Sequence, residues 1–330
     1  MPRLVACLAV AGIWLALGDR VGSGAAPSRA AVFTSWVRVS VATVWLKPSS
    51  PRAIDAPALA RPVRVEEWLA GLSVSERLAL DSRIQTQLLL GQEVLVLGRR
   101  RGWSRVEVPE QRGSHYPNGI IGWIPTIQLT TVAPLGGRVL VVAVPDTWLY
   151  RVANGEIGRR RILVSYDTEL PVVGSASDDV VVGLPGGRMG AIAQSALRSL
   201  PVGPVRGAEV AGAAHLFLGL PYLWGGTSAF GYDCSGLVYA VFARYGLILP
   251  RDAADQKRVG IPVPLGKLQP GDLLFFAGRR GRGRVHHVAI YVGDGFMIDS
   301  PYTGASIEMV PMTSSAIWDE FAGATRVTGS

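Results

Sequence analysis

The stretch PYLWGGTSAFGYDCSG, residues 221 to 236, decides the fold of the C-terminal part of the chain. It places Cys234 at the predicted start of a helix, because Asp233 is a favoured N-cap residue and CSGLVYAVFARY continues at helical spacing to Gly246. The unpaired N–H groups and the dipole of a first helical turn stabilise a thiolate, the nucleophilic form of cysteine. The glycines of WGG permit the close backbone turns needed to present a substrate at the helix tip.

The cysteine content leaves two interpretations of Cys234. The only other cysteine, Cys7, lies in a segment expected to be removed, so the mature protein would have one thiol and no disulfide. A lone thiol in an exported protein is either buried and inert or retained for its chemistry. The position of Cys234 at a helix start favours a chemical role for its thiol.

A thiolate nucleophile needs a base, and the chain has four histidines. His115 lies in a predicted barrel loop. His215 lies in the predicted amphipathic helix over 208–220, on the apolar face with Leu216, where packing is the expected role. These two are therefore set aside as bases.

The remaining histidines, His286 and His287, lie on a predicted strand over 285–293 and face opposite ways. Valine and isoleucine follow on the side of His286. If that side is the core, His287 faces the site, and the small Ala289 beside it leaves room for a substrate. We therefore predict His287 as the base.

A third polar group usually orients a catalytic imidazole. The next predicted strand, 295–300, offers Asp299 on an otherwise apolar stretch. Its alternative role is that of a surface charge at a strand end.

The N-terminus has the order of an export signal. It begins with MPR, continues with an apolar run over 4–18 and ends in small and polar residues. We expect an exported protein in the extracellular space or cell envelope, with an uncleaved anchor or lipidation at Cys7 as alternatives.

The formal net charge of +8 favours anionic surroundings such as a cell wall. Nucleic acid is excluded as a partner by the expected export. The densest basic run, AGRRGRGR at 277–284, also lacks the interleaved aromatic residues of a single-strand binder, and we predict a solvated hairpin loop there.

The first two hundred residues contain an internal repeat. RVSVATVWL at 38–46 resembles RVLVVAVPDTWL at 138–149, and the strand pairs at 102–125 resemble those at 177–193. The pattern predicts two copies of one small all-β barrel. The first copy carries an insertion over 65–83 with apolar residues at helical spacing and a capping-box pair, Ser73 and Glu76, that predicts a second short helix.

After residue 204 the pattern changes to helices followed by the strands 272–278, 285–293 and 295–300, which is typical of an α+β domain. The motifs PYLWGG, DCSGLV, LPRDAADQ, LQPGDLLFF and HHVAIYVGDG, in this order, resemble the NlpC-type cell-wall cysteine peptidases, whose domain has a papain-like fold. The preceding region is similar to the bacterial SH3-like barrels found in a subgroup of that family.

The N-terminal pattern, the internal repeat and the resemblance together predict four segments along the chain. A signal peptide or anchor covers 1–30, the first SH3-like barrel with its helical insertion 31–134, the second barrel 135–203 and the peptidase domain 204–330.

The resemblance also implies roles for the catalytic residues. Cys234 matches the nucleophile and His287 the general base, and the hydroxyl of Tyr222 would stabilise the oxyanion together with the Cys234 N–H group. The family's third polar position, often a histidine, is occupied here by Asp299.

Further residues are implied to bind the substrate. Asp233 and Ser235 would hold a free amine, Arg251 and Asp252 would line a D-glutamate pocket, and Trp224 would contact the peptide. In the subgroup the first barrel adds an acid and a tyrosine, which the sequence alone does not place here.

The expected function is cleavage of the bond between γ-D-glutamate and a diamino acid, in peptidoglycan peptides or muropeptides with a free N-terminal L-alanine. We expect a monomer that uses no cofactor. We also expect no metal ion, because one cysteine and two histidines that face opposite ways cannot form a tetrahedral set of metal ligands. Two alternatives are an amidase or acyltransferase on the same fold, and a non-catalytic wall-binding protein.

Overall fold

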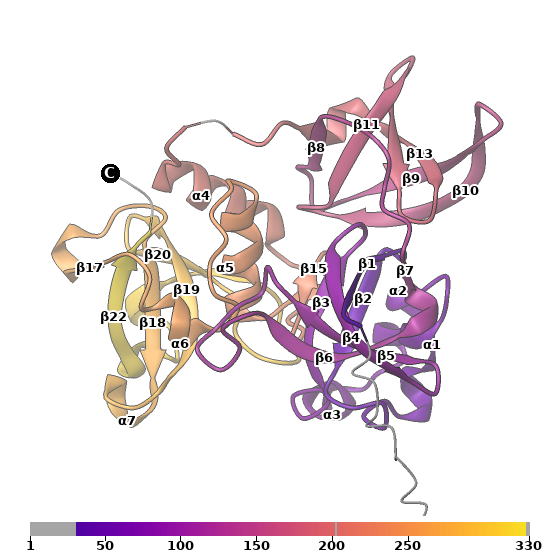
Figure 1. The fold of residues 1–330 in the computed structure, drawn as a ribbon. Helices are drawn as coiled ribbons and strands as arrows, with labels where there is room; N and C mark the ends of the chain where they lie inside the picture. The colour runs from indigo at the N-terminus through magenta and orange to yellow at the C-terminus, as the bar shows by residue number, and fades with distance from the viewer. Residues whose placement is uncertain (1–30, 202, 328–330) are drawn as a thin grey trace, which may run out of the picture. The chain divides into compact units, whose positions relative to one another are not determined.

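The computed structural model describes residues 31–201 and 203–327 (Figure 1). The predicted export segment and Cys7 lie outside the described residues. In the described part, no helix is long and apolar enough to cross a membrane. The described chain forms two seven-stranded sheets, a two-stranded sheet and a six-stranded sheet, and helices accompany the last of these. This is the predicted α+β class with two preceding β-barrels.

The first barrel consists of seven antiparallel strands in the order β3-β2-β6-β5-β4-β1-β7. Their bounds are β1 (Phe33–Val37), β2 (Val41–Trp45), β3 (Ile84–Leu89), β4 (Glu93–Arg100), β5 (Trp103–Val108), β6 (Ile120–Pro125) and β7 (Leu129–Thr130). The side chains alternate with a period of two: in β5, Val106 and Val108 are buried whereas Arg105 is exposed. A short 3-10 turn, Thr126–Gln128, precedes β7.

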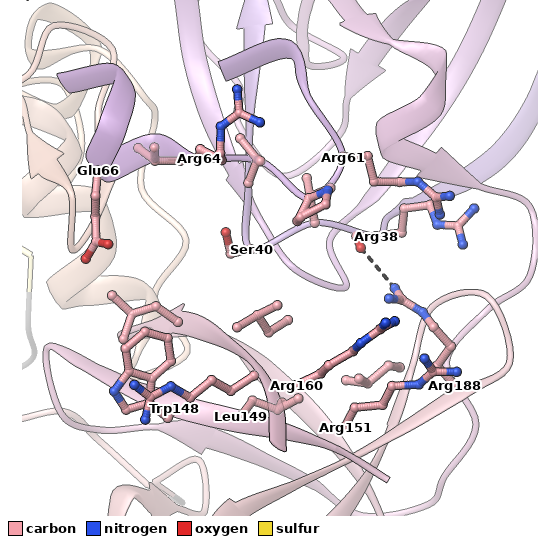
Figure 2. Close-up of a pocket in the computed structure, with 18 of the residues that line it drawn as sticks. Arg38, Ser40, Arg61, Arg64, Glu66, Trp148, Leu149, Arg151, Arg160 and Arg188 are labelled. Carbon is pink, nitrogen blue, oxygen red and sulfur yellow. Dashed lines mark hydrogen bonds between the residues drawn. The ribbon is translucent and has the colours of Figure 1, made fainter. Parts of the chain in front are cut away.

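The second barrel repeats the first strand for strand. Its order, β10-β9-β13-β12-β11-β8-β14, is that of the first barrel with every label advanced by seven. The bounds are β8 (Val139–Val142), β9 (Asp146–Ala153), β10 (Glu156–Ser165), β11 (Glu169–Ala176), β12 (Asp179–Leu184), β13 (Arg188–Ala193) and β14 (Leu197–Arg198), and a 3-10 turn at Gln194–Ala196 precedes β14. The predicted duplication is confirmed. In Figure 2 the guanidinium of Arg188 donates to the carbonyl oxygen of Arg38 across 2.9 Å, which joins the two barrels.

The insertion in the first barrel forms the two short helices predicted over 65–83, and further helical turns precede them. In chain order these elements are a 3-10 turn (Ala53–Asp55), α1 (Ala56–Leu59), α2 (Val65–Ala70) and α3 (Val74–Leu78). The capping box is present: the Ser73 N–H donates to Glu76 Oε2 over 2.8 Å, and the Glu76 N–H donates to Ser73 Oγ over 3.3 Å. Because α3 starts at its own cap, the apolar stripe of α2 does not continue through it, and Leu78 is exposed.

The C-terminal part contains a six-stranded sheet in the order β17-β22-β18-β19-β20-β21. The strands are β17 (Ile261–Val263), β18 (Leu273–Ala277), β19 (Val285–Gly293), β20 (Phe296–Asp299), β21 (Glu308–Pro311) and β22 (Phe321–Arg326), with β15 (Thr227–Ser228) and β16 (Gly231–Tyr232) paired separately. The helices are α4 (Gly207–Ala214), α5 (Cys234–Ala243), α6 (Ala253–Gln256) and the turn α7 (Gly278–Gly281), with 3-10 turns at His215–Phe217, Leu265–Lys267, Met312–Ser314 and Trp318–Glu320. The basic run around α7 connects β18 to β19, as the predicted hairpin loop requires, and Arg279 and Arg280 are exposed there.

The predicted packing role of His215 is wrong. The α-helix α4 ends at Ala214 and continues as a 3-10 turn, which changes the rotation per residue and carries Leu216 and His215 to the surface. His215 instead places Nδ1 2.8 Å from the carbonyl oxygen of Ala211. Phe217 remains fully buried, 4.9 Å from the ring of Tyr166 in the second barrel.

Candidate active site

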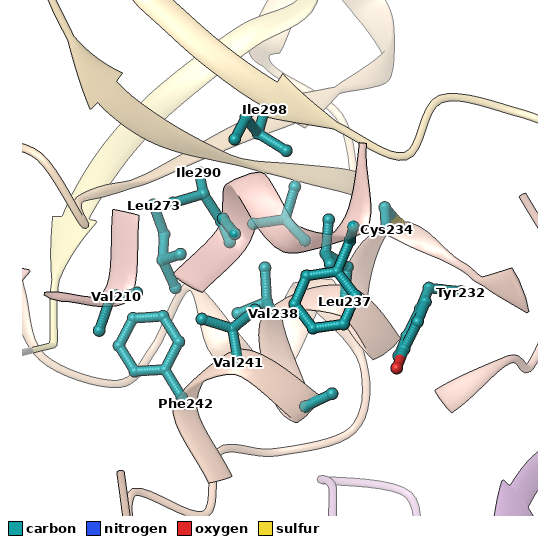
Figure 3. Close-up of a cluster of buried hydrophobic side chains, with 14 of the residues drawn as sticks. Val210, Tyr232, Cys234, Leu237, Val238, Val241, Phe242, Leu273, Ile290 and Ile298 are labelled. Atoms are coloured by element: carbon teal, nitrogen blue, oxygen red, sulfur yellow. The ribbon is translucent and has the colours of Figure 1, made fainter. Parts of the chain in front are cut away.

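Cys234 is the first residue of α5 and is buried, with 8% of its surface exposed. The side chain of Asp233 caps the helix, because its Oδ1 accepts the N–H of Gly236 over 2.6 Å. Cys234 belongs to the apolar cluster that α5 forms with the sheet through residues such as Leu237 and Ile290 (Figure 3). The thiol therefore occupies the predicted first turn, at the edge of a packed core.

Two glycines allow the preceding loop to lie directly on this helix turn. A Cβ atom on Gly236 would lie 2.0 Å from the carbonyl oxygen of Gly226, and a Cβ on Gly226 would lie 2.2 Å from the carbonyl oxygen of Gly231. Any side chain at either position would clash with backbone. The predicted close backbone turn at the WGG glycines is confirmed at Gly226, and Gly236, after the cysteine, meets the same requirement.

His287 is buried and faces Asp299, whereas His286 is exposed. The Nε2 atom of His287 lies 2.6 Å from Asp299 Oδ1, and the Nε2 atom of His286 lies 2.9 Å from Glu320 Oε2. The predicted orientation of the pair is confirmed.

The orientation was predicted from a core on the valine and isoleucine side of the strand and a substrate site on the other side. That reason is only half correct. Val288 and Ile290 pack on the α5 side of the sheet, but Ala289 is also buried, in a second apolar cluster with Phe276 on the other side. Both sides of β19 are therefore covered, and Ala289 does not line the active-site cavity. The predicted room for a substrate beside Ala289 is wrong.

The surroundings of His287 favour its protonated form. Burial lowers the pKa of the imidazole, but the charge of Cys234 and hydrogen bonds with Asp299 and Cys234 outweigh it and raise the pKa well above its ordinary value. Since Nε2 contacts Asp299, Nδ1 is the ring nitrogen available to the thiol. A protonated imidazole in the same cavity as the thiol can act as the proton donor that thiol catalysis requires.

Replacement of Asp299 by asparagine is expected to shift the pH dependence of turnover. Asp299 raises the pKa of His287, so its neutralisation lowers that pKa, and the imidazolium loses its proton at a lower pH. The alkaline limb of kcat/KM should therefore move to lower pH, and kcat should fall roughly tenfold. A kcat/KM profile between about pH 5 and about pH 10 measures both effects.

Glu320→Gln is the matched control, because Glu320 forms the same kind of pair with the neighbouring His286. Its alkaline limb should coincide with that of the native protein. An Asp299→Asn limb that also coincides with the native one would contradict the role of Asp299.

Tyr222 lies in the same cavity as Cys234 and is buried. Burial raises the pKa of its phenol, and the charges of Asp233 and Cys234 raise it further. The hydroxyl therefore stays protonated and can donate a hydrogen bond at neutral pH. Its backbone N–H is held by the carbonyl oxygen of Ala305 at 2.9 Å, which fixes the loop that bears it.

Arg251 connects the helix tip to the first barrel. The residue is 2% exposed, and its guanidinium forms a two-pronged pair with Asp233, at 2.7 Å to Oδ2 and 3.0 Å to Oδ1. It also donates to Ser235 Oγ at 3.0 Å and to Thr86 Oγ1 of β3 at 3.1 Å. Burial lowers the pKa of Arg251, but the adjacent carboxylate of Asp233 raises it overall, so the buried charge is retained.

These contacts bear on the predicted amine acceptors. Both carboxylate oxygens of Asp233 already accept protein hydrogen bonds, including one at 2.8 Å from the N–H of Gly225. The cavity is lined by Asp233, Ser235 and Arg251, as their predicted contact with the substrate requires. The contact itself stays a prediction.

The cavity around Cys234 has a volume of about 740 Å³ and is lined by both the barrel and the C-terminal part. Trp224 and Asp252 are among its lining residues, as predicted for substrate contacts. Their roles stay predictions. Burial raises the pKa of Asp252, although the neighbouring Arg251 opposes this.

The sequence did not identify the barrel residues of this cavity. Leu78, Asp81 and Gln85 of the first barrel line it, and Gln85 donates to the hydroxyl of Tyr116 at 3.2 Å. Tyr116 stands in the loop before β6 and is not among the residues that line the cavity. Arg284 and Tyr302 of the C-terminal part also line the cavity, and the sequence did not identify them either.

The barrel is hydrogen-bonded to the loop that precedes α5. Thr227 Oγ1 donates to the Gln87 carbonyl oxygen at 3.1 Å, and Ser228 Oγ donates to Gln87 Oε1 at 2.8 Å. The Ser114 N–H donates to Asp255 Oδ2 at 2.7 Å. The cavity wall supplied by the first barrel is therefore fixed to the helix tip. Across residues 31–201 and 203–327, no group of three His, Cys, Asp or Glu side chains is arranged to hold a metal ion.

Comparisons with known sequences identify similar proteins. A sequence model of the NlpC/P60 family matches residues 219–326, and one of the YKFC SH3b2 domain matches residues 142–198. The chain is 39% identical over 292 residues to a "Gamma-D-glutamyl-L-lysine dipeptidyl-peptidase" of Bacillus subtilis, covering 87% of this chain and 96% of that protein. It is 37% identical over 302 residues to a protein of the same name from Bacillus cereus, covering 88% and 90%.

A solved structure agrees with the fold. The crystal structure of an NlpC/P60 family protein from Bacillus cereus superposes with a TM-score of 0.84 at 36% identity, covering 90% of this chain and all of that one. The likeness extends through both barrels as well as the C-terminal part.

Proposed function

This chain belongs to the NlpC/P60 family, and from that membership we propose that it is a cysteine endopeptidase acting on peptidoglycan stem peptides. The bond that it hydrolyses joins γ-D-glutamate to a diamino acid, in peptides with a free N-terminal L-alanine. The observation that carries the proposal is that Cys234, at its helix start, lines the same cavity as His287, whose imidazole Asp299 orients across 2.6 Å. The names of the two relatives support the choice of bond.

The reaction follows from these groups. The Cys234 thiolate attacks the γ-carbonyl carbon of D-glutamate, and the charge that develops on its oxygen is stabilised by the Tyr222 hydroxyl and the Cys234 N–H. Protonated His287 then donates its proton to the amine of the diamino acid, which leaves as the C–N bond breaks. Water, deprotonated by His287, attacks the thioester carbonyl and releases the L-Ala-γ-D-Glu dipeptide and the thiolate.

The residues that line the cavity support a preference for substrates with only a short peptide on the N-terminal side of the cleaved bond. We assign the free amine to the carboxylate of Asp233 with Ser235, and the D-glutamate to the region of Arg251 and Asp252. Asp81 of the first barrel adds a further carboxylate to the cavity wall. A cationic amine is stabilised by such an acidic surrounding, whereas a neutral amide is not.

The substrate itself tests this proposal. L-Ala-γ-D-Glu-L-Lys should be cleaved to the dipeptide and lysine, and its N-acetyl derivative should react with a kcat/KM lower by roughly 100-fold or more, because acetylation removes the positive charge that the carboxylates of Asp233 and Asp81 would bind. Mass spectrometry of the products identifies the bond. Cleavage at the muramyl-L-alanine bond would show an amidase, and equal rates for the free and acetylated peptides would contradict the amine pocket.

The location of the protein and the molecules that it binds follow from the proposed function. We propose that the protein is exported through residues 1–30, works in the cell envelope as a monomer and takes wall-derived peptides as its partners.

A further inference from the structure

A second cavity, of about 890 Å³, lies between the two barrels (Figure 2). It shares no lining residue with the cavity at Cys234. Its walls come from the loop between β1 and β2, the segment before α2 with the first turn of α2, and β9, β10, β12 and β13, with Phe230 of the peptidase part. The proposed reaction makes no use of it.

Arginine dominates this cavity. Seven arginines from both barrels line it, against two glutamates, Glu66 and Glu67. The arginines are Arg38, Arg61, Arg64, Arg151, Arg160, Arg161 and Arg188. Glu67 is paired with Arg64 at 2.6 Å, and within the described ranges none of the other six arginines has a carboxylate at ion-pair distance.

The guanidinium groups crowd one end of the cavity. Figure 2 shows Arg38, Arg61, Arg151 and Arg188 gathered there, away from Glu66. Burial lowers the pKa of Arg188, and the positive charges of Arg38, Arg61 and Arg151 lower it further. Like charges held together without counter-charges are stabilised by a bound anion.

Arg38 has a donor available to that anion. The Nε atom of Arg38 is buried without a hydrogen-bond partner. Gly186, which has no side chain, faces the guanidinium of Arg38: a Cβ there would lie 3.5 Å from Arg38 Nη2 and 3.8 Å from Arg188 Nε. The unpartnered Nε of Arg38 thus lies close to the guanidinium of Arg188, whose Nε and Nη2 atoms donate to the carbonyl oxygens of Pro185 and Arg38.

The other end of the cavity is amphipathic. The ring of Trp148 is partly exposed, and the guanidinium carbon of Arg161 lies 4.0 Å from its centroid. This cation–π contact holds the Arg161 side chain in place, which lowers the entropy lost on binding a ligand. Aromatic and aliphatic surface beside fixed cations suits a ligand with both carbon-rich and anionic groups.

We propose that this cavity binds an anionic polymer of the cell envelope whose polyol or sugar units are joined by phosphodiester groups. Each guanidinium fork matches the two free oxygens of a phosphodiester, and a chain that repeats this group can engage several of the six unpaired arginines at once. A single carboxylate would engage one or two. The envelope as the source of the polymer rests on the proposed function, whereas anion binding does not.

Titration with a defined poly(glycerol phosphate) oligomer tests the site, using the full chain and the triple variant Arg61→Gln, Arg151→Gln, Arg160→Gln. These three side chains form no side-chain hydrogen bond or ion pair in the described chain, so their loss leaves the barrels joined. We expect Kd to rise roughly tenfold or more, with a weaker dependence on salt between about 50 mM and about 200 mM.

The matched control is Arg100→Gln, Arg105→Gln, Arg282→Gln, which removes the same charge from exposed arginines outside both cavities. It should bind the oligomer within about twofold of the native protein. Both triple variants should cleave L-Ala-γ-D-Glu-L-Lys at the native rate, which shows that they fold. Equal weakening by the two triples, or no binding by the native protein, would overturn the proposal.

Two other polyanions decide the ligand class. Polyglutamate that binds as tightly as the phosphodiester oligomer would overturn the preference for phosphate, and a single-stranded oligonucleotide that binds more tightly would overturn the envelope as the source. Neither titration depends on catalysis, so a protein that fails to cleave the peptide can still bind the polymer, and the two proposals fail separately.

Discussion

Replacement of Cys234 by alanine is expected to abolish release of L-Ala-γ-D-Glu, lowering kcat by roughly four orders of magnitude or more. Cys234 supplies the thiol in the cavity that His287 also lines, and a water molecule in its place would lack both the nucleophilicity of sulfur and the position at the helix start. Digestion of L-Ala-γ-D-Glu-L-Lys with equal amounts of the native and variant proteins, followed by mass spectrometry, measures the effect.

A neighbouring substitution separates loss of chemistry from loss of folding. His286→Ala removes an exposed imidazole that contacts Glu320, so it should keep most of the activity, whereas His287→Ala should lose activity like Cys234→Ala. Equal peptide release by the native protein and Cys234→Ala would end the peptidase mechanism.

Replacement of Arg251 by methionine is expected to cost about 3–5 kcal/mol in the free energy of unfolding. The change removes the cation from a buried pair and leaves the carboxylate of Asp233 without its main partner. It also removes the donor to Thr86, so the first barrel loses a bond to the helix tip. Thermal unfolding should show a fall in Tm of roughly 10 °C.

Arg258→Met provides the comparison. Arg258 pairs with Asp255 at 3.0 Å, but its side chain is mostly exposed, so its loss should cost at most about 1 kcal/mol. Similar falls in Tm for the two variants would show that the buried pair contributes no more than a surface pair does.

The sequence predicted those features that depend on near neighbours. Asp233 caps the helix that begins at Cys234, and Ser73 with Glu76 starts α3, because both depend on residues two to three positions apart. The alternation of two residues along β19 also separated His287 from His286. The duplicated barrel emerged because each copy carries the same short strand pattern.

The features that the sequence missed depend on contacts between distant segments. Arg251 meets Thr86 across 165 positions, and no local pattern records that pairing. Leu78 belongs to a stripe of apolar spacing, yet it is exposed and lines the cavity, because the peptidase part rather than α2 faces it. His215 was misplaced because the change from α-helix to 3-10 turn after Ala214 shifts the register of the apolar face.

The bonds from Thr227 and Ser228 to Gln87 have a consequence for inherited variation in this protein. A substitution that unfolds the first barrel also releases the loop in front of the thiol, although it lies far from Cys234 along the chain. Substitutions that abolish activity should therefore occur in the first barrel as well as at the active site. Screens that select for loss of turnover should recover both kinds.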